Sequence, residues 1–417
     1  ITARICGICP VSHLLASSKA CDEIMAVRIP DAAAKLRELL HCAQIVQSHA
    51  LSFFHLSAPD LLLGMDADPA RRNIAGLLEE HPDALRDGIA LRKFGQQVIE
   101  RLAKERVHPS WTVPGGVNLP LDPAAREKTL AELPGAVAIV KRTLALWKKT
   151  VESFPDEIEA FSNFPTMYCG LVGPDGSLRL YDGNLRFVGP DGAIVADQVR
   201  PDDYAAHIGE ASLPDSYLKA PYYRPAGYPD GIYRVGPLAR LNVADRCGTP
   251  DADAELEEYR GRFGRIVQSG FHYHYARLIE SVYALERMQQ LLDDPAILAT
   301  KVRARAGVNN LEGVGIIEAP RGTLIHHYKV DDNGAITWAN LIVATGHNNL
   351  AMGRGVLQVA KRFVDGKKIQ EGALNRVSAL VRAYDPCLSC STHNLGTAAV
   401  VLELRGPDGQ LLDEVAT

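Results

Sequence analysis

The sequences RICGICPVSH at residues 4–13 and DPCLSCSTH at residues 385–393 decide how this chain is organised. Each contains a Cys-x-x-Cys pair with a histidine close behind it, and nearly the whole chain lies between the two pairs. Two intervening residues let the backbone turn both thiols of a pair inward, which is a spacing typical of metal ligands. We therefore expect the two pairs to meet, so that four thiolates hold one metal centre where the ends of the chain come together.

Cysteine spacing alone leaves other interpretations open. A thioredoxin-like redox pair needs a strand–helix junction in a βαβ unit, which is not evident in this sequence. A structural zinc site built from both pairs is a second alternative, and coincidence is a third. Thiolates are soft ligands that suit zinc, iron or nickel, so spacing does not identify the metal. The other four cysteines are isolated, and we interpret them as small buried hydrophobic residues: Cys21, Cys42, Cys169 and Cys247.

Composition indicates an ordinary globular protein with a sizeable core, because 47% of the 417 residues are hydrophobic and 23% are charged. The formal net charge of −5 offers no electrostatic basis for binding nucleic acid. No run of about 18 apolar residues occurs, so we expect no membrane span. The cysteine usage suits a reducing, cytoplasmic location. The chain opens at Ile1 without a methionine, and we expect that its true beginning is missing.

Apolar periodicity predicts a mainly α-helical fold with a small α+β part. The expected helices span 14–27, a long segment from Asp31 that Pro59 ends, 84–106, 123–152, two segments within 251–292, 348–362 and 372–384. Short strands with hairpin turns are expected over 167–199, further strands over 311–345, and irregular loops over 108–116 and 213–248. We predict one large helical-bundle domain, 1–417, with a β-rich insertion at about 165–245.

The flanks of the two cysteine pairs closely resemble the signatures of nickel–iron hydrogenase large subunits. Further stretches of that family match in order along the chain: HPSWTVPGGV (108–117), GPLARLN (236–242), EAPRGTL (318–324) and ATGHNN (344–349). The regions around 180–183 and 222–246 are most similar to the soluble, NAD-reducing members. The resemblance therefore implies the nickel–iron hydrogenase large-subunit fold and reversible heterolytic cleavage of H2.

The same resemblance implies roles for individual residues. Cys6 and Cys387 are expected to bind nickel terminally, while Cys9 and Cys390 bridge nickel and an iron that carries CO and CN ligands. Pro320, Arg321 and Thr345 are expected to line the pocket of those diatomic ligands. His13 is expected to donate a hydrogen bond to a bridging sulfur. Asp385 is expected to pair with Arg321 or a neighbouring group, and Cys387 is favoured over Arg321 as the proton acceptor.

Partners follow partly from the resemblance and partly from counting cysteines. No further cysteine cluster remains for an iron–sulfur centre, so we expect an iron–sulfur small subunit, with NAD on diaphorase subunits. A maturation endopeptidase is expected to remove residues 394–417, after which His393 helps to bind magnesium. The proton-relay glutamate and the magnesium-binding carboxylate of the family are expected to precede Ile1.

Two other classes of function remain as alternatives. One is a non-catalytic subunit of hydrogenase descent in a complex I-like assembly, although such relatives lose the cysteines that this chain keeps. The other is a structural domain whose fold is stabilised by a zinc ion. Several histidines are as well explained by structure as by proton transfer, and we leave them outside the catalytic set: His49, His55, His272, His274, His326 and His327. Ser48 stands where many membrane-bound relatives carry aspartate.

Overall fold

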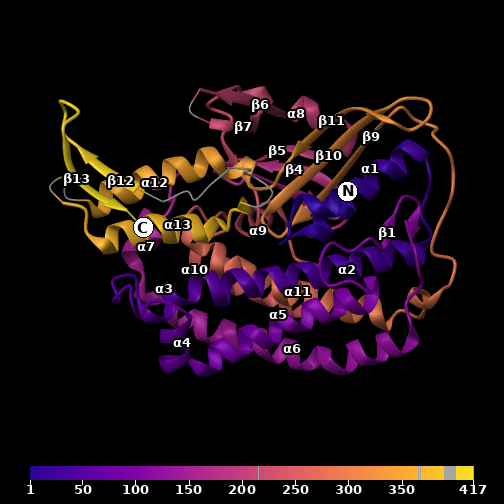
Figure 1. Cartoon of the computed structure of the whole chain (residues 1–417), viewed down its shortest axis with the longest axis horizontal. Coiled ribbons are helices and arrows are strands. Elements are labelled where there is room, and N and C mark those ends of the chain that lie inside the picture. Colours follow the sequence, from indigo (N-terminus) through magenta and orange to yellow (C-terminus); the bar gives the residue numbers. More distant parts are fainter. Residues whose placement is uncertain (215, 365, 367, 389–400, 417) are drawn as a thin grey trace.

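The computed structural model describes residues 1–214, 216–364, 366, 368–388 and 401–416 (Figure 1). The α-helices are α1 (Pro10–Met25), α2 (Asp31–Ala50), α3 (Ala58–Leu63), α4 (Ile74–Glu80), α5 (Pro82–Ala103), α6 (Pro123–Thr150), α7 (Pro155–Ala160), α8 (Tyr204–His207), α9 (Pro237–Val243), α10 (Pro250–Phe263), α11 (Tyr273–Asp293), α12 (Asn349–Phe363) and α13 (Glu371–Tyr384). The strands are β1 (Thr112–Val113), β2 (Gly116–Val117), β3 (Met167–Val172), β4 (Asn184–Val188), β5 (Ile194–Val199), β6 (Ile208–Leu213), β7 (Ser216–Tyr223), β8 (Tyr233–Arg234), β9 (Glu312–Ala319), β10 (Gly322–Val330), β11 (Ile336–Ile342), β12 (Val401–Arg405) and β13 (Leu411–Ala416).

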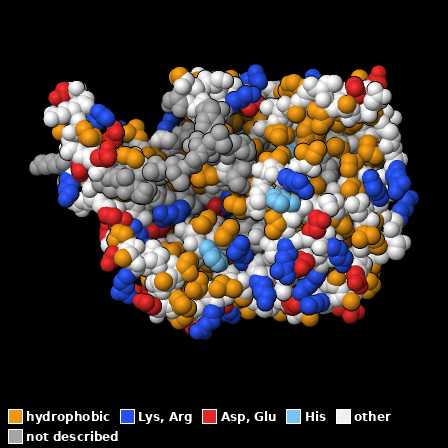
Figure 2. Space-filling model, in the orientation of Figure 1, with side chains coloured by type: hydrophobic (Ala, Val, Ile, Leu, Met, Phe, Trp, Pro, Cys, Tyr) orange, Lys and Arg blue, Asp and Glu red, His pale blue; other side chains and the backbone are white. Residues whose placement is uncertain are grey.

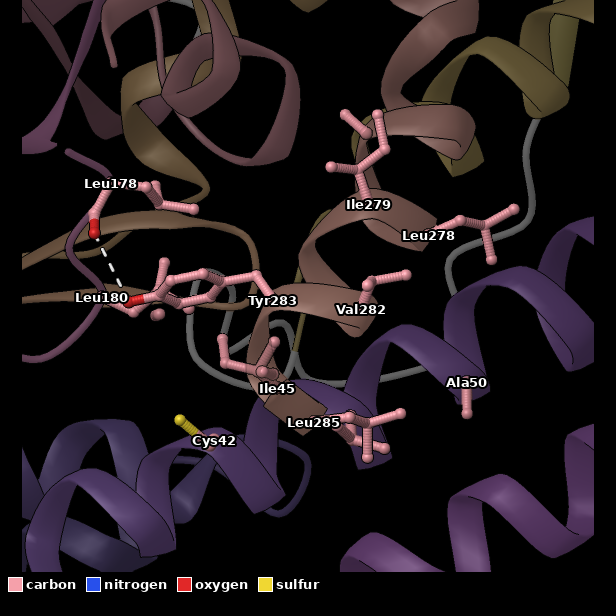
Figure 3. Close-up of a cluster of buried hydrophobic side chains, with 14 of the residues drawn as sticks. Cys42, Ile45, Ala50, Leu178, Leu180, Leu278, Ile279, Val282, Tyr283 and Leu285 are labelled. Carbon is pink, nitrogen blue, oxygen red and sulfur yellow. Dashed lines mark hydrogen bonds between the residues drawn. The ribbon is translucent and has the colours of Figure 1, made fainter. Parts of the chain in front are cut away.

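Four long helices pack against one another beneath the sheets. Helix α2 contacts both α5 and α11, and α6 contacts the same two helices on their other side (Figure 1). Figure 3 shows the interior of this arrangement, where Cys42 and Ile45 of α2 lie beside Val282 and Leu285 of α11. The apolar stripes predicted from the sequence are therefore the surfaces through which these helices pack.

The two largest sheets lie above the helices, together with the two-stranded sheet β6-β7 (Figure 1). One has the strand order β5-β4-β3-β8, with β3 and β8 parallel and the other neighbours antiparallel. The other is the antiparallel sheet β11-β10-β9, which carries α1 on β9 and β10. A side chain at Gly315 would place its Cβ 1.9 Å from the carbonyl oxygen of Ala16, so only glycine lets β9 approach α1 this closely. This contact fixes the first cysteine pair, at the start of α1, against the β9–β10 hairpin.

The structure corrects three predictions. Pro59 does not end a helix: the chain runs from α2 through a π-helix, Leu51–Ser57, into α3. Proline fits the first turn of α3 because its missing N–H has no partner there in any helix. Residues 213–248 are not an irregular loop, since they contain β7, β8 and α9. Pro221 fits β7 because that strand forms one edge of the two-stranded sheet β6-β7. The predicted loop at 108–116 is likewise not irregular throughout, since it includes β1 and the first residue of β2.

The other expected elements are present with shifted ends, and β3–β8 all lie within the predicted insertion. The turn at 406–409 connects β12 to β13. Within the described ranges, no helix is both long enough and apolar enough to cross a bilayer. Figure 2 shows basic and acidic side chains interspersed over the helical part of one face. The organisation of 1–417 as one domain stays a prediction.

Candidate metal centre

Three of the four predicted cysteine ligands meet in the interior. The Sγ atoms of Cys6 and Cys387 lie 3.2 Å apart, those of Cys6 and Cys9 3.3 Å, and those of Cys9 and Cys387 3.9 Å. All three side chains are buried. Metal–sulfur bonds of about 2.3 Å in tetrahedral geometry put ligand sulfurs about 3.8 Å apart, so one ion can hold this set. Among the described residues, the Cys, His, Asp and Glu side chains that cluster closely enough to bind a metal are these three thiols. The predicted ligands Cys390 and His393 lie outside the described residues.

The backbone around the first pair favours negative charge on its sulfurs. Cys6 directly follows a short 3₁₀ turn (Thr2–Ile5), and Cys9 is the N-cap of α1. The backbone N–H groups of Ile8 and Cys9 both donate to the Sγ atom of Cys6, each at 3.3 Å. The N-terminus of a helix carries partial positive charge, which stabilises a thiolate at Cys9.

The second pair is presented where α13 stops. Asp385 terminates the helix in a left-handed conformation (φ 55°, ψ 55°), which aspartate tolerates better than most residues. The backbone N–H of Cys387 then donates to the hydroxyl of Thr345 at 2.9 Å. The hydrogen bond connects the segment that carries Cys387 to the loop after β11.

The predicted cofactor-binding residues line one small pocket beside the thiols. Its walls contain Pro320, Arg321, Thr345 and His13 together with Cys9, Cys387, Ala319, Leu324, Val343 and Ala344. Pro320 and Arg321 are the two-residue loop of the β9–β10 hairpin, in which Ala319 pairs with Gly322. The hairpin therefore places Arg321 at its tip, against the pocket.

Arg321 and Asp385 form an ion pair, which is one of the two pairings expected for Asp385. The Nη2 atom of Arg321 lies 2.9 Å from Oδ1 of Asp385, and its Nη1 donates to the Oγ of Ser48 at 3.2 Å. The two side chains are only 3% and 2% exposed. Because burial removes both charges from water, each depends on the other for its compensation.

His13 contacts His326, which we interpreted from the sequence as structural. His326 in turn contacts Tyr328, which the sequence did not single out. Its Nδ1 lies 3.0 Å from Nε2 of His326, whose Nδ1 is 2.5 Å from the hydroxyl of Tyr328. Burial lowers the pKa of His13 to about 4, although the charge on Cys6 opposes that shift. His13 is therefore neutral at pH 7, and because His326 occupies its Nδ1, only its Nε2 remains for the pocket.

A buried ionic network behind the hairpin was missed altogether. Arg240 binds the carboxylates of both Glu280 and Glu318, and Glu280 also accepts a hydrogen bond from His49. Burial alone would raise the pKa of Glu280, but Arg240 and His49 outweigh it and lower that pKa to about 2. Arg240 and Glu318 belong to the quoted motifs at 236–242 and 318–324, which was the one available signal.

Three other histidines set aside in the sequence, His272, His274 and His327, have partners away from the pocket. His272 lies against the ring of Phe263, and His274 packs among aromatic rings that include Trp147. His327 contacts the hydroxyl of Tyr204 at 2.9 Å and the carboxylate of Glu312 at 2.6 Å. Their contacts are those of structural residues.

Comparison with known proteins identifies the class of this chain. The chain belongs to the nickel-dependent hydrogenase family, whose profile matches residues 1–83 and 196–393. The family predicted from the motifs is thereby confirmed.

Particular relatives are similar over most of their length. The chain is 43% identical to a subunit of the F420-non-reducing hydrogenase vhu from Methanococcus voltae, over 87% of this chain and 86% of that protein. It is 40% identical to the beta subunit of the NAD-reducing hydrogenase HoxS from Cupriavidus necator, over 99% of this chain and 88% of that protein. The crystal structure of an NAD⁺-reducing [NiFe]-hydrogenase in the H2-reduced state superposes with a TM-score of 0.90 at 45% identity, covering 94% of this chain and 87% of that one.

Proposed function

We propose that this chain is the catalytic subunit of a nickel–iron hydrogenase that cleaves H2 heterolytically and passes the electrons, through iron–sulfur partner subunits, to NAD. The observation that carries the proposal is the buried set of Cys6, Cys9 and Cys387 beside the Arg321–Asp385 pair. Family membership supports the nickel chemistry, and similarity to NAD-reducing relatives supports the acceptor.

The donor set fits the proposed metal centre. Three soft sulfurs within 3.9 Å of one another suit nickel and iron, and Cys390 completes the set by sequence. When bound, the centre supplies Lewis-acid and electron-transfer chemistry. Pro320, Leu324 and Val343 give the pocket an apolar wall, and Arg321 and Thr345 offer donors to small diatomic ligands such as CO and CN.

The chain's own residues divide the work of moving the proton. We assign the acceptor role to the Cys387 thiolate, which lines the pocket. An arginine guanidinium stays protonated in proteins and Asp385 holds that of Arg321 in place, so we assign it the role of a fixed positive charge beside the reacting atoms and not that of the base. Electrons must leave through a partner, because only Cys21, Cys42, Cys169 and Cys247 remain and all are far apart in sequence.

The rest of the assembly follows from the same proposal. An iron–sulfur small subunit would receive the electrons and diaphorase subunits would reduce NAD in the cytoplasm. A maturation endopeptidase would remove 394–417, leaving His393 to bind magnesium. The F420-non-reducing relative from Methanococcus voltae, at 43% identity, is as similar as the NAD-reducing one at 40%, which favours a carrier other than NAD as the second candidate acceptor.

The test is metal analysis together with turnover, on protein purified with its partners from a host able to mature it. We expect about one nickel and little zinc per chain, and NAD reduction that depends on H2, with NADP and a redox dye assayed in parallel. Reduction of the dye without reduction of NAD would support the second candidate acceptor, a carrier other than NAD. Zinc in place of nickel would support the structural domain stabilised by zinc, and a processed chain without nickel would support the non-catalytic complex I-like subunit.

A further inference from the structure

Arg240 lies directly behind the hairpin loop that carries Arg321. Its side chain is fully buried in the middle of α9, and the start of the same helix touches the loop. A Cβ at Gly236, the N-cap of α9, would lie 2.7 Å from the carbonyl oxygen of Arg321. Helix α9 and the hairpin are therefore in direct backbone contact at the residue preceding the helix.

All five N–H donors of the Arg240 guanidinium are used. Nε and Nη2 bind Glu280 at 2.5 and 2.6 Å, and Nη1 binds Glu318 at 2.9 Å. The two remaining hydrogens point to main-chain carbonyls: Nη1 donates to Ala319 at 2.9 Å and Nη2 to Pro320 at 3.2 Å. Ala319 and Pro320 are the two residues that precede Arg321.

The carboxylates of Glu280 and Glu318 fix the orientation of the Arg240 guanidinium, which in turn binds the hairpin loop. Glu280 comes from α11 and is fixed from its other side by His49 of α2 at 2.8 Å. Glu318 comes from β9 and accepts further hydrogen bonds from the backbone N–H of Leu171 and the hydroxyl of Thr323. Five elements, α11, α2, β9, β3 and β10, thus fix one planar group directly or through its two carboxylates, which leaves the guanidinium a single orientation.

We propose that Arg240 is a positioning residue, which sets the place and direction of Arg321 over the thiol pocket by holding the carbonyls of Ala319 and Pro320. The inference rests on the proposed function, in which Arg321 supplies positive charge beside the reacting atoms. A two-residue loop has few backbone torsions of its own, so the direction of its tip depends on what binds its carbonyls. Lysine in place of Arg240 keeps the charge between the two carboxylates, but three donors in place of five cannot serve every acceptor.

The test is a double-mutant cycle on the complex, using Arg240→Lys, Arg321→Lys and both together. We expect Arg240→Lys to lower kcat for H2 oxidation by about 10²-fold, the scale of a misplacement of about 1 Å, with nickel content and KM for H2 unchanged. If Arg240 acts through Arg321, the double variant is no slower than Arg321→Lys alone. Effects that multiply would overturn the proposal, and so would a near-normal kcat in Arg240→Lys.

The matched control is Arg37→Lys. Arg37 is equally buried and donates hydrogen bonds to the carboxylate of Asp22 and to two main-chain carbonyls. Those carbonyls belong to Val113 and Gly116, not to the hairpin loop that carries Arg321. A purely structural effect of losing a buried guanidinium lowers stability in both variants, whereas kcat per nickel falls only in Arg240→Lys.

A second variant keeps the proposal testable if Arg240→Lys does not retain nickel. Glu318→Gln leaves Arg240 in place but weakens one of its two anchors, and we expect a smaller loss of kcat at full nickel content. A normal kcat in Glu318→Gln would then overturn the proposal. Failure of the proposed function is distinguishable, because in that case the wild-type complex itself shows neither nickel nor H2 turnover.

Discussion

Glu280→Gln removes one negative charge from the network behind the hairpin while keeping the size of the side chain. The Glu280 carboxylate accepts hydrogen bonds from Nε and Nη2 of Arg240 and from Nε2 of His49, at 2.5, 2.6 and 2.8 Å, and is fully buried. A glutamine turns its NH2 group toward at least one of those donors, so one contact becomes repulsive. Removing one partner of a buried ion pair costs about 3 to 5 kcal/mol.

That free energy corresponds to a modest but measurable change in melting temperature. Unfolding entropy is about 2.1 cal/mol/K per residue, or about 0.9 kcal/mol/K for a chain of 417 residues, so the midpoint should fall by about 3 to 6 °C. The assay is thermal unfolding of the purified complex at pH 7 and one scan rate. Glu258→Gln is the control, because its partners Lys148 and Arg262 are surface ion pairs worth less than about 1 kcal/mol. An equal midpoint shift in the two variants would refute the energetic role given to burial.

Arg321→Lys should lower kcat by about 10²-fold or more while both metals stay bound, because lysine cannot bind Asp385 and Ser48 with one fixed fork; near-normal turnover would remove Arg321 from the mechanism. Cys6→Ser and Cys387→Ser should each abolish nickel retention and H2 uptake together, and metal analysis showing wild-type nickel would contradict their assignment as ligands. The free energy of unfolding should fall as the pH drops from about 6.5 to 4. Burial lowers the pKa of His41 and of His272 to about 4, so over that interval the unfolded chain takes up protons that the folded chain does not. Urea midpoints that stay constant between pH 6.5 and 5 would show that these histidines do not titrate as their burial requires.

The helices could be predicted from the sequence because their packing faces repeat locally. Residues such as Leu36, Leu39, Leu40 and Ala43 recur at three- and four-residue steps, and all are buried where α2 meets its neighbours. Strand β7 and helix α9 could not be predicted in the same way. Their prolines and glycines occupy an edge strand and a first helical turn, positions that local composition does not distinguish from a loop.

The metal ligands could be predicted because each pair of cysteines lies within a few residues in the sequence. The residues that fix the site through contacts between distant parts of the chain could not be predicted. Cys-x-x-Cys pairs are recognisable within four residues, and their meeting required only the assumption that both serve one metal. The contact of His13 with His326 joins positions 313 residues apart. No spacing rule connects such positions, so a histidine that fixes another histidine looks the same in sequence as one that fills the core.

The buried charges around the pocket tie the two ends of the chain together. Arg277, also buried, has its pKa lowered to about 10 by burial, with Asp385 opposing the shift and Arg321 adding to it. Three arginines and three acids therefore face one another in the interior: Arg240, Arg277, Arg321, Glu280, Glu318 and Asp385. Since water does not reach them, each charge is compensated only when the element carrying its partner has docked. The segment after α13 carries both Asp385 and Cys387, so the described thiol set and the compensation of Arg321 both require it in place. The metal-binding pocket and the balance of its buried charge therefore depend on the same short segment of the chain.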